Sequence, residues 1–185
     1  MVITTSPLVK TYTLQEFWDL PEPADRSKLE LIKGVLYMSP PPGEGHDYAT
    51  ADLIEQLGAA IKQCGYRGKI LSPRAALWID DDTYLEPDLM YVSEELKAQM
   101  KPGHRTRADI VVEILSPSAE TYDRKTKSDT YRVMGVREVW IVNAETKEVE
   151  VRSFEAGKTV VYKTQDTLRS EVLPKIAIPV TALFS

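Results

Sequence analysis

The chain has 185 residues, 43% hydrophobic and 28% charged, which are values of a globular protein and exclude a disordered or fibrous one. This length predicts one domain over 1–185, with 1–12 as a loosely ordered N-terminal segment. A single cysteine, Cys64, and two histidines exclude a disulfide framework and an ordinary structural zinc site. Neither a signal peptide nor a membrane-spanning apolar run is visible, so we expect a cytoplasmic protein.

The formal net charge of −5 is unusual for a protein that acts on nucleic acid. Such proteins generally carry a basic face that neutralises phosphates. Contact with DNA would therefore need a local patch, and the candidates are Arg67, Lys69, Arg74, Lys101, Arg105 and Arg107. The alternative interpretation is that these residues are scattered over a solvated surface. The negative charge favours this alternative without excluding a patch.

The first third of the chain predicts a helix, a hairpin and a second helix. Thr13 and Glu16 form a capping box for a short helix, and Lys33-Gly34 can turn a hairpin within 28–38. Glu30 lies on the first arm, where a lone glutamate would usually face solvent. Apolar residues recur at helical spacing between 46 and 65, with His46 in the first turn, where it caps the helix or hydrogen-bonds a substrate phosphate.

A second hairpin with an acidic turn is predicted around 80–82. Its first arm, 77–79, is the end of a strand over 68–79, and its second arm is 84–92. Contiguous acids in such a turn are usually solvated, so we reject them as the primary metal site. Pro87 lacks an amide donor and belongs near a strand start. Asp88 would then enter the sheet beside the apolar core. A short helix is predicted from Ser93 to Met100.

The stretch 108–142 reads as strand, tight turn, helix and strand. Asp109–Leu115 is mostly β-branched or apolar, with Glu113 in its middle, and Ser116 to Ser118 break the strand and can cap a helix. Glu113 lies roughly 10 Å before the turn. Lys127 lies roughly 13 Å along the returning helix. Lys127 should therefore reach the level of Glu113.

The same helix should present a stripe of polar residues to the sheet. Asp123, Lys127 and Tyr131 are spaced four apart and share one face. The strand 138–143 completes a β-α-β unit. Two in-sheet acids and a helix-borne lysine suit a divalent metal ion, which needs hard oxygen ligands. Beyond 143, a hairpin over 149–154 and 159–163 and a short strand within 173–184 look like scaffold or a dimer surface.

These segments resemble a known family. Pro87-Asp88, Glu113, the LSPS turn at 115–118, the D-R-x-x-K of 123–127, YTLQEF and ELIKGVLYMSPPPGEGH are similar to the Uma-two family of restriction endonuclease-like proteins, in the PD-(D/E)XK nuclease superfamily. The resemblance covers about 13–184. It implies an α/β (α+β) fold with a restriction-endonuclease-like core, a central mixed β-sheet flanked by helices, and extra β-hairpins. One departure is that Leu115 stands where the superfamily has its lysine, which implies that Lys127 is the displaced lysine.

The resemblance implies a metal-dependent endonuclease that hydrolyses DNA phosphodiester bonds with Mg²⁺, or Mn²⁺ as a substitute. The implied residues fall into three groups. Asp88, Glu113, Lys127 and Glu30 would be catalytic, Asp88, Glu113 and the Ile114 carbonyl would hold the metal, and His46, Asp123 and Tyr131 would bind substrate.

Two alternatives remain open. One is an inactive nuclease-fold module that binds nucleic acid or another partner, with Glu113 and Lys127 as a structural ion pair. The other is a metal hydrolase acting on a different phosphate substrate. A homodimer is expected by analogy with endonucleases that cut both strands.

Overall fold

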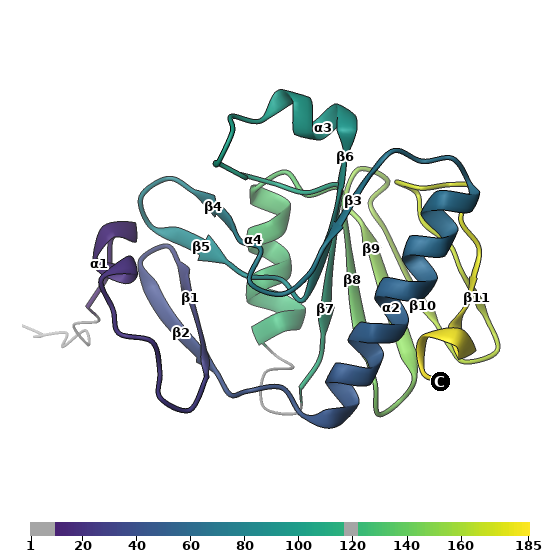
Figure 1. Ribbon diagram of the computed structural model, residues 1–185, viewed down its shortest axis with the longest axis horizontal. Helices are drawn as coiled ribbons and strands as arrows, with labels where there is room; N and C mark the ends of the chain where they lie inside the picture. Colours follow the sequence, from purple (N-terminus) through teal and green to yellow (C-terminus); the bar gives the residue numbers. More distant parts are fainter. Residues whose placement is uncertain (1–9, 117–121) are drawn as a thin grey trace, which may run out of the picture.

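A large mixed sheet forms the centre of the protein (Figure 1). The computed structural model describes residues 10–116 and 122–185, and only the backbone of 122 and 123. The strand order is β10-β9-β8-β7-β6-β3, and only β7 and β8 run parallel. The bounds are β3 Gly68–Leu71, β6 Leu89–Ser93, β7 Ile110–Ile114, β8 Glu138–Asn143, β9 Glu148–Ser153 and β10 Lys158–Tyr162.

The central strand β7 is buried on both faces, as its apolar sequence predicts. Ile110, Val112 and Ile114 pack into one core cluster, whereas Val111 and Leu115 pack into the other. Side chains alternate between the two faces of a strand, so Glu113 shares the face of Val111. The only acid within this strand therefore points to the side of the sheet that carries the second core cluster.

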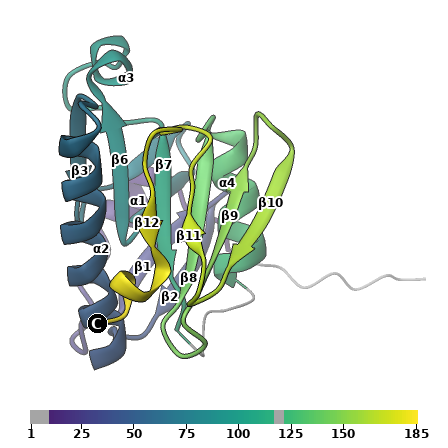
Figure 2. The same cartoon turned by 90° about the vertical axis from the view of Figure 1, so that its right-hand side faces the viewer.

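Helices cover both faces of the large sheet, as the two views together show (Figures 1 and 2). The long helix α2, Glu44–Gln63, packs on one face with the C-terminal segment of β11 (Thr167–Leu168), β12 (Ile178–Pro179) and a 3₁₀ turn (Val180–Leu183). Its buried stripe is Ala49, Leu53, Leu57 and Ile61. The other face carries α4, Ser128–Val133, and α3, Glu94–Gln99, through Tyr131, Met134 and Leu96.

A smaller sheet stands beside this second face and has the order β2-β1-β5-β4. Its strands are β1 Lys28–Ile32, β2 Val35–Ser39, β4 Leu77–Ile79 and β5 Thr83–Leu85. The β1–β2 turn has positive φ at both Lys33 and Gly34, which is the geometry of a two-residue hairpin turn. The predicted capping box of Thr13 and Glu16 is confirmed at the start of α1, Leu14–Trp18.

The fold class is confirmed as mixed α/β, but two strand predictions are wrong in extent. The segment 84–92 is not one arm, because β5 belongs to the small sheet and β6 to the large one. Pro87 lacks the donor that a continuous ladder would need, and the chain crosses between the sheets there. The segment 68–79 divides in the same way into β3 and β4.

The connection from β7 to α4 also differs from the prediction. A π-helical turn, Tyr122–Lys127, precedes α4, where a single α-helix was expected. Pro117 and Ser118, expected to break the strand and begin the helix, lie outside the described residues. In the part of the chain that is described, no helix is both long and apolar enough to cross a bilayer.

Candidate active site

Asp88 directly precedes β6, and Glu113 lies on the neighbouring strand β7 of the large sheet. The antiparallel register pairs Leu89 with Val112 and Met90 with Val111, so one further step sets Asp88 against Glu113. Residues directly opposite on adjacent strands share a face. The Ile114 amide donates a 2.7 Å hydrogen bond to Oδ2 of Asp88, which fixes the carboxylate at the end of the strand pair.

Lys127 meets Glu113 from the helix side of the sheet. Its Nζ lies 3.2 Å from both Oε1 and Oε2 of Glu113 and 2.9 Å from Oε2 of Glu30. All three side chains are at most 2% exposed. Lys127 therefore meets Glu113 as the strand and helix rises predicted, although the returning segment begins with a π-helical turn.

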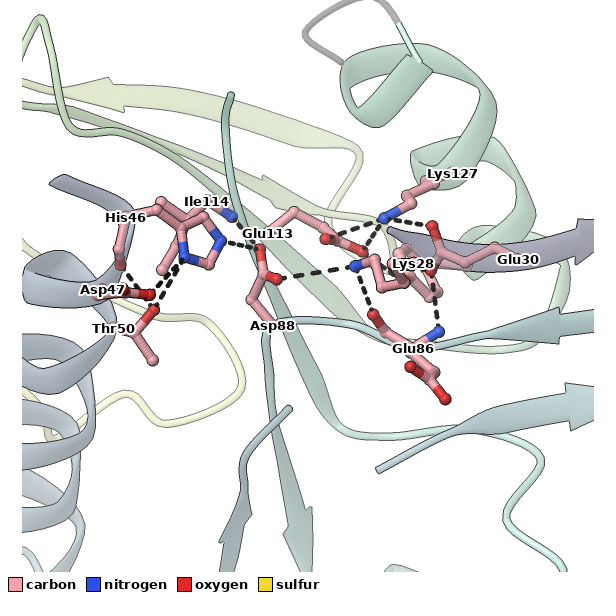
Figure 3. Close-up of polar contacts among 11 residues, drawn as sticks. Lys28, Glu30, His46, Asp47, Thr50, Glu86, Asp88, Glu113, Ile114 and Lys127 are labelled. Atoms are coloured by element: carbon pink, nitrogen blue, oxygen red, sulfur yellow. Dashed lines mark hydrogen bonds and ion pairs between the residues drawn. The ribbon is translucent and has the colours of Figure 1, made fainter. Parts of the chain in front are cut away.

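Glu30 is brought into the same cluster by the small sheet. Its Oε1 accepts a 2.9 Å hydrogen bond from the Glu86 amide, in the segment that crosses between the two sheets. The carboxylate is buried, so the solvent-facing interpretation of a lone strand glutamate is wrong. Glu30 and Glu113 hold Lys127 between them (Figure 3).

Tyr131 fixes Glu113 and does not border the cavity of the site. Its hydroxyl donates a 2.5 Å hydrogen bond to Oε1 of Glu113, and its side chain is fully buried. Burial and the neighbouring charge of Glu113 raise the pKa of Tyr131 well above its ordinary value, so the phenol keeps its proton. The expectation that Tyr131 binds substrate is corrected: it positions a carboxylate. The side chain of Asp123 lies outside the described residues.

His46 and Lys28 approach Asp88 from opposite sides (Figure 3). The His46 Nε2 atom lies 3.2 Å from Oδ2, and the Lys28 ammonium lies 3.7 Å from Oδ1. Burial alone would raise the pKa of Asp88, but the hydrogen bond from His46 and the charge of Lys28 outweigh it and lower the pKa. Asp88 therefore stays ionised well below neutral pH.

Lys28 is a site residue that the sequence reasoning missed. Its Nζ donates a 2.9 Å hydrogen bond to the Glu86 carbonyl oxygen and lies 3.9 Å from Glu30. Burial would lower its pKa, but the charges of Glu30, Glu113 and Asp88 raise it on balance. The signal was available in the sequence, because Lys28 and Glu30 are two residues apart on one strand and so share a face.

A cavity of about 550 Å³ opens onto these residues. Its wall includes Lys28, His46, Asp88, Glu113 and Lys127. Lys127 borders it with a side chain only 2% exposed, whereas the side chain of Lys28 is 26% exposed. Of the two ammonium groups, Lys28 is therefore the one more open to a ligand.

The donor set fits a hard divalent cation that keeps much of its water. Asp88 and Glu113 supply two carboxylates to one cavity, and Ile114 also lines that cavity. Among the described residues, no three His, Cys, Asp or Glu side chains gather as an all-protein metal cage. Mg²⁺ does not need one, since it is typically bound through one or two carboxylates with waters and phosphate oxygens. Asp88, Glu113 and the Ile114 carbonyl are the residues that would hold it.

Comparisons with known proteins identify the family of the chain. A family model, Uma2, described as "Putative restriction endonuclease", matches residues 14–181. The chain belongs to the Uma2 family. An uncharacterized protein of Synechocystis sp. is 30% identical over 139 residues, which are 72% of this chain and 73% of the relative.

A solved structure shows the same fold. It is a crystal structure from Anabaena variabilis of a protein described as a putative nuclease belonging to DUF820. The TM-score is 0.75 at 18% identity, over 94% of this chain and 97% of that one. The predicted family and fold of this Uma2 protein are confirmed, and the family supports a nuclease.

Proposed function

We propose that this Uma2 protein is a metal-dependent endonuclease that hydrolyses phosphodiester bonds of DNA. The observation that carries the proposal is the facing pair of carboxylates, Asp88 and Glu113, in one cavity with Lys28 and Lys127. Mg²⁺ held there by the two carboxylates and the Ile114 carbonyl would polarise the phosphate and lower the pKa of a bound water.

The residues of the chain divide the remaining work. Lys127 and Tyr131 hold Glu113 in one position, so the carboxylate needs little reorganisation when a cation arrives. His46 and Lys28 keep Asp88 ionised. Lys28 also reaches the cavity, where its ammonium can donate a hydrogen bond to a phosphate oxygen as negative charge develops on it.

The proposal is tested by cleavage of plasmid and single-stranded DNA with Mg²⁺, with Mn²⁺ and with EDTA. Asp88→Asn keeps an oxygen that can accept from the Ile114 amide but removes the charge, and we expect its cleavage to fall by about 10²-fold or more. Asp80→Asn is the matched control, because Asp80 is an exposed acid of the 80–82 turn with a left-handed backbone that asparagine tolerates. Equal cleavage by wild type and Asp88→Asn would contradict the proposal.

A second candidate function is a nuclease-fold module that binds nucleic acid without cutting it. It is favoured by the contacts of Glu113, whose two oxygens already accept hydrogen bonds from Lys127 and Tyr131. Calorimetric titration separates the two functions. Heat on addition of Mg²⁺ or Mn²⁺ that disappears in Asp88→Asn supports the enzyme, whereas a folded wild type that binds neither ion, with or without DNA, supports the module.

A further inference from the structure

The arginines of this chain differ in whether their side chains are already paired. The sequence contains ten. Six of them donate to protein oxygens, namely Arg67, Arg105, Arg107, Arg124, Arg137 and Arg152. Within the described residues, no hydrogen bond or ion pair engages the side chains of the other four, Arg26, Arg74, Arg132 and Arg169. Of these four, only Arg26 and Arg74 line the cavity that holds Asp88 and Glu113.

Arg26 and Arg74 also share an unusual backbone conformation. Their φ angles are 64° and 75°, in the left-handed region that costs free energy for any residue with a Cβ atom. Glycine or asparagine would make either turn at lower cost. Lys33, Asp80 and Lys147 adopt the same conformation in turns outside the cavity wall, so the two arginines are distinguished by combining it with a place in that wall.

The two arginines reach the cavity from separate segments. Arg26 precedes β1 by two residues, and Arg74 follows Pro73 in the connection between β3 and β4. Both side chains are exposed. Within the described residues, no acid of the cavity wall forms an ion pair with either arginine: Asp88 contacts His46 and Lys28, and Glu113 contacts Lys127. The other two acids, Asp47 and Glu86, contact His46 and Tyr84. Two unpaired guanidinium groups therefore stand at the rim of the carboxylate site.

The candidate basic patch named from the sequence is divided in the structure. Arg74 lines this cavity, whereas Arg67 and Arg107 line another of about 610 Å³, and Lys101 and Arg105 line a third. This division agrees with the alternative that the negative charge favoured, in which these basic residues are scattered. Arg26, which the sequence reasoning did not consider, is the second arginine at the site.

We infer that Arg26 and Arg74 bind backbone phosphates of a nucleic acid next to the phosphate that enters the cavity. The inference rests on the proposed function and assigns its substrate contacts. A guanidinium matches a phosphate with two parallel hydrogen bonds, and it stays charged at all relevant pH values. Such contacts fix the position of the strand without reading its sequence.

The test is equilibrium binding of a fluorescent duplex DNA, measured by anisotropy from low to high NaCl, in EDTA and separately in Ca²⁺. The variant is R26N/R74N, because asparagine tolerates the left-handed backbone. The melting temperature of this variant should therefore match that of wild type. Each lost phosphate contact should make the log–log salt dependence shallower by about 0.9, so by about 1.8 for the pair. R26K/R74K should keep most of the wild-type slope, and R132N/R169N, the matched control with unpaired arginines away from the cavity, should keep all of it.

Two outcomes overturn the inference: R26N/R74N with the affinity and salt slope of wild type, or a wild type that binds DNA in neither buffer. Hydrolysis of bis(p-nitrophenyl) phosphate, which lacks flanking phosphates, separates the inference from the proposed function. Equal hydrolysis of this ester by wild type and R26N/R74N, with weaker DNA binding by the variant, supports both. If neither protein hydrolyses the ester but the variant still has a shallower salt dependence, the result contradicts the enzymatic function and supports the phosphate contacts.

Discussion

Replacing Lys127 with methionine should lower the free energy of unfolding at pH 7 by about 3–5 kcal/mol. Methionine keeps the length of the side chain but removes an ammonium 2.9 Å from Glu30 and 3.2 Å from both oxygens of Glu113. Both carboxylates are at most 2% exposed, so water cannot replace the lost partner. The cost arises because buried negative charge is left uncompensated.

Urea denaturation followed by far-UV circular dichroism measures this loss. With a slope of about 2 kcal/mol per molar urea, the midpoint should fall by about 1.5–2.5 M. The pH dependence should also change sign. In Lys127→Met, protonation would remove uncompensated buried charge, so the variant regains stability as the pH falls from 7. In wild type, Asp88 contributes the opposite dependence, because folding lowers its pKa and its contribution to stability is lost as the pH falls.

Glu30→Gln provides the matched control. It keeps an oxygen that can accept from the Glu86 amide and leaves Lys127 paired with Glu113. The double variant Glu30→Gln/Lys127→Met should lose less stability than the sum of the single variants, since one of the two orphaned charges is gone. A Lys127→Met midpoint within about 0.3 M of wild type, with an unchanged pH dependence, would refute a buried charge balance at this site.

Three further predictions concern the residues around the two carboxylates. Tyr131→Phe should cost about 1.5–3 kcal/mol in the same urea experiment, because Glu113 loses a buried donor. In thermal melts, Asp88→Asn should lose less stability than wild type as the pH falls below about 4. The lowered pKa of Asp88 stabilises the native state at pH values above the unfolded pKa of about 3.9, and this stabilisation disappears as the pH falls. In His46→Gln, the loss of stability at acid pH should begin at a higher pH than in wild type. An unchanged pH for this loss would show that His46 does not lower the pKa of Asp88.

The position of Lys127 could be predicted from the sequence because it depends on local geometry alone. Strand rise, a tight turn and helix rise determine how far along the returning segment a residue meets Glu113. The π-helical turn did not change this outcome, since Nζ of Lys127 still lies 3.2 Å from Glu113. Short-range geometry also gave the β1–β2 hairpin and the start of α1 correctly.

The environment of Asp88 could not be predicted in this way, because it depends on how two sheets meet. The segment Glu86-Pro87-Asp88 looks like strand sequence, but it crosses from the small sheet to the large one. That crossing brings Lys28 and Glu30 of β1 to the acids of β6 and β7. No periodicity within a single segment shows that β1 meets these acids, so Glu30 rested on resemblance. Lys28, which shares the face of Glu30, could have been found only through Glu30.

Net charge was a poor guide to this site for a related reason. The residues that line the cavity include four cations and four carboxylates, namely Arg26, Lys28, Arg74 and Lys127, and Asp47, Glu86, Asp88 and Glu113. The cavity is thus formally neutral in a chain of net charge −5. Lys28 and Lys127 balance Asp88 and Glu113, which leaves Arg26 and Arg74 against Asp47 and Glu86. Attraction of a polyanion would then depend on where the two arginines lie and on any divalent ion bound by the acids. A small number of unpaired charges in the right place, more than the total charge of the surface, would then decide whether nucleic acid binds.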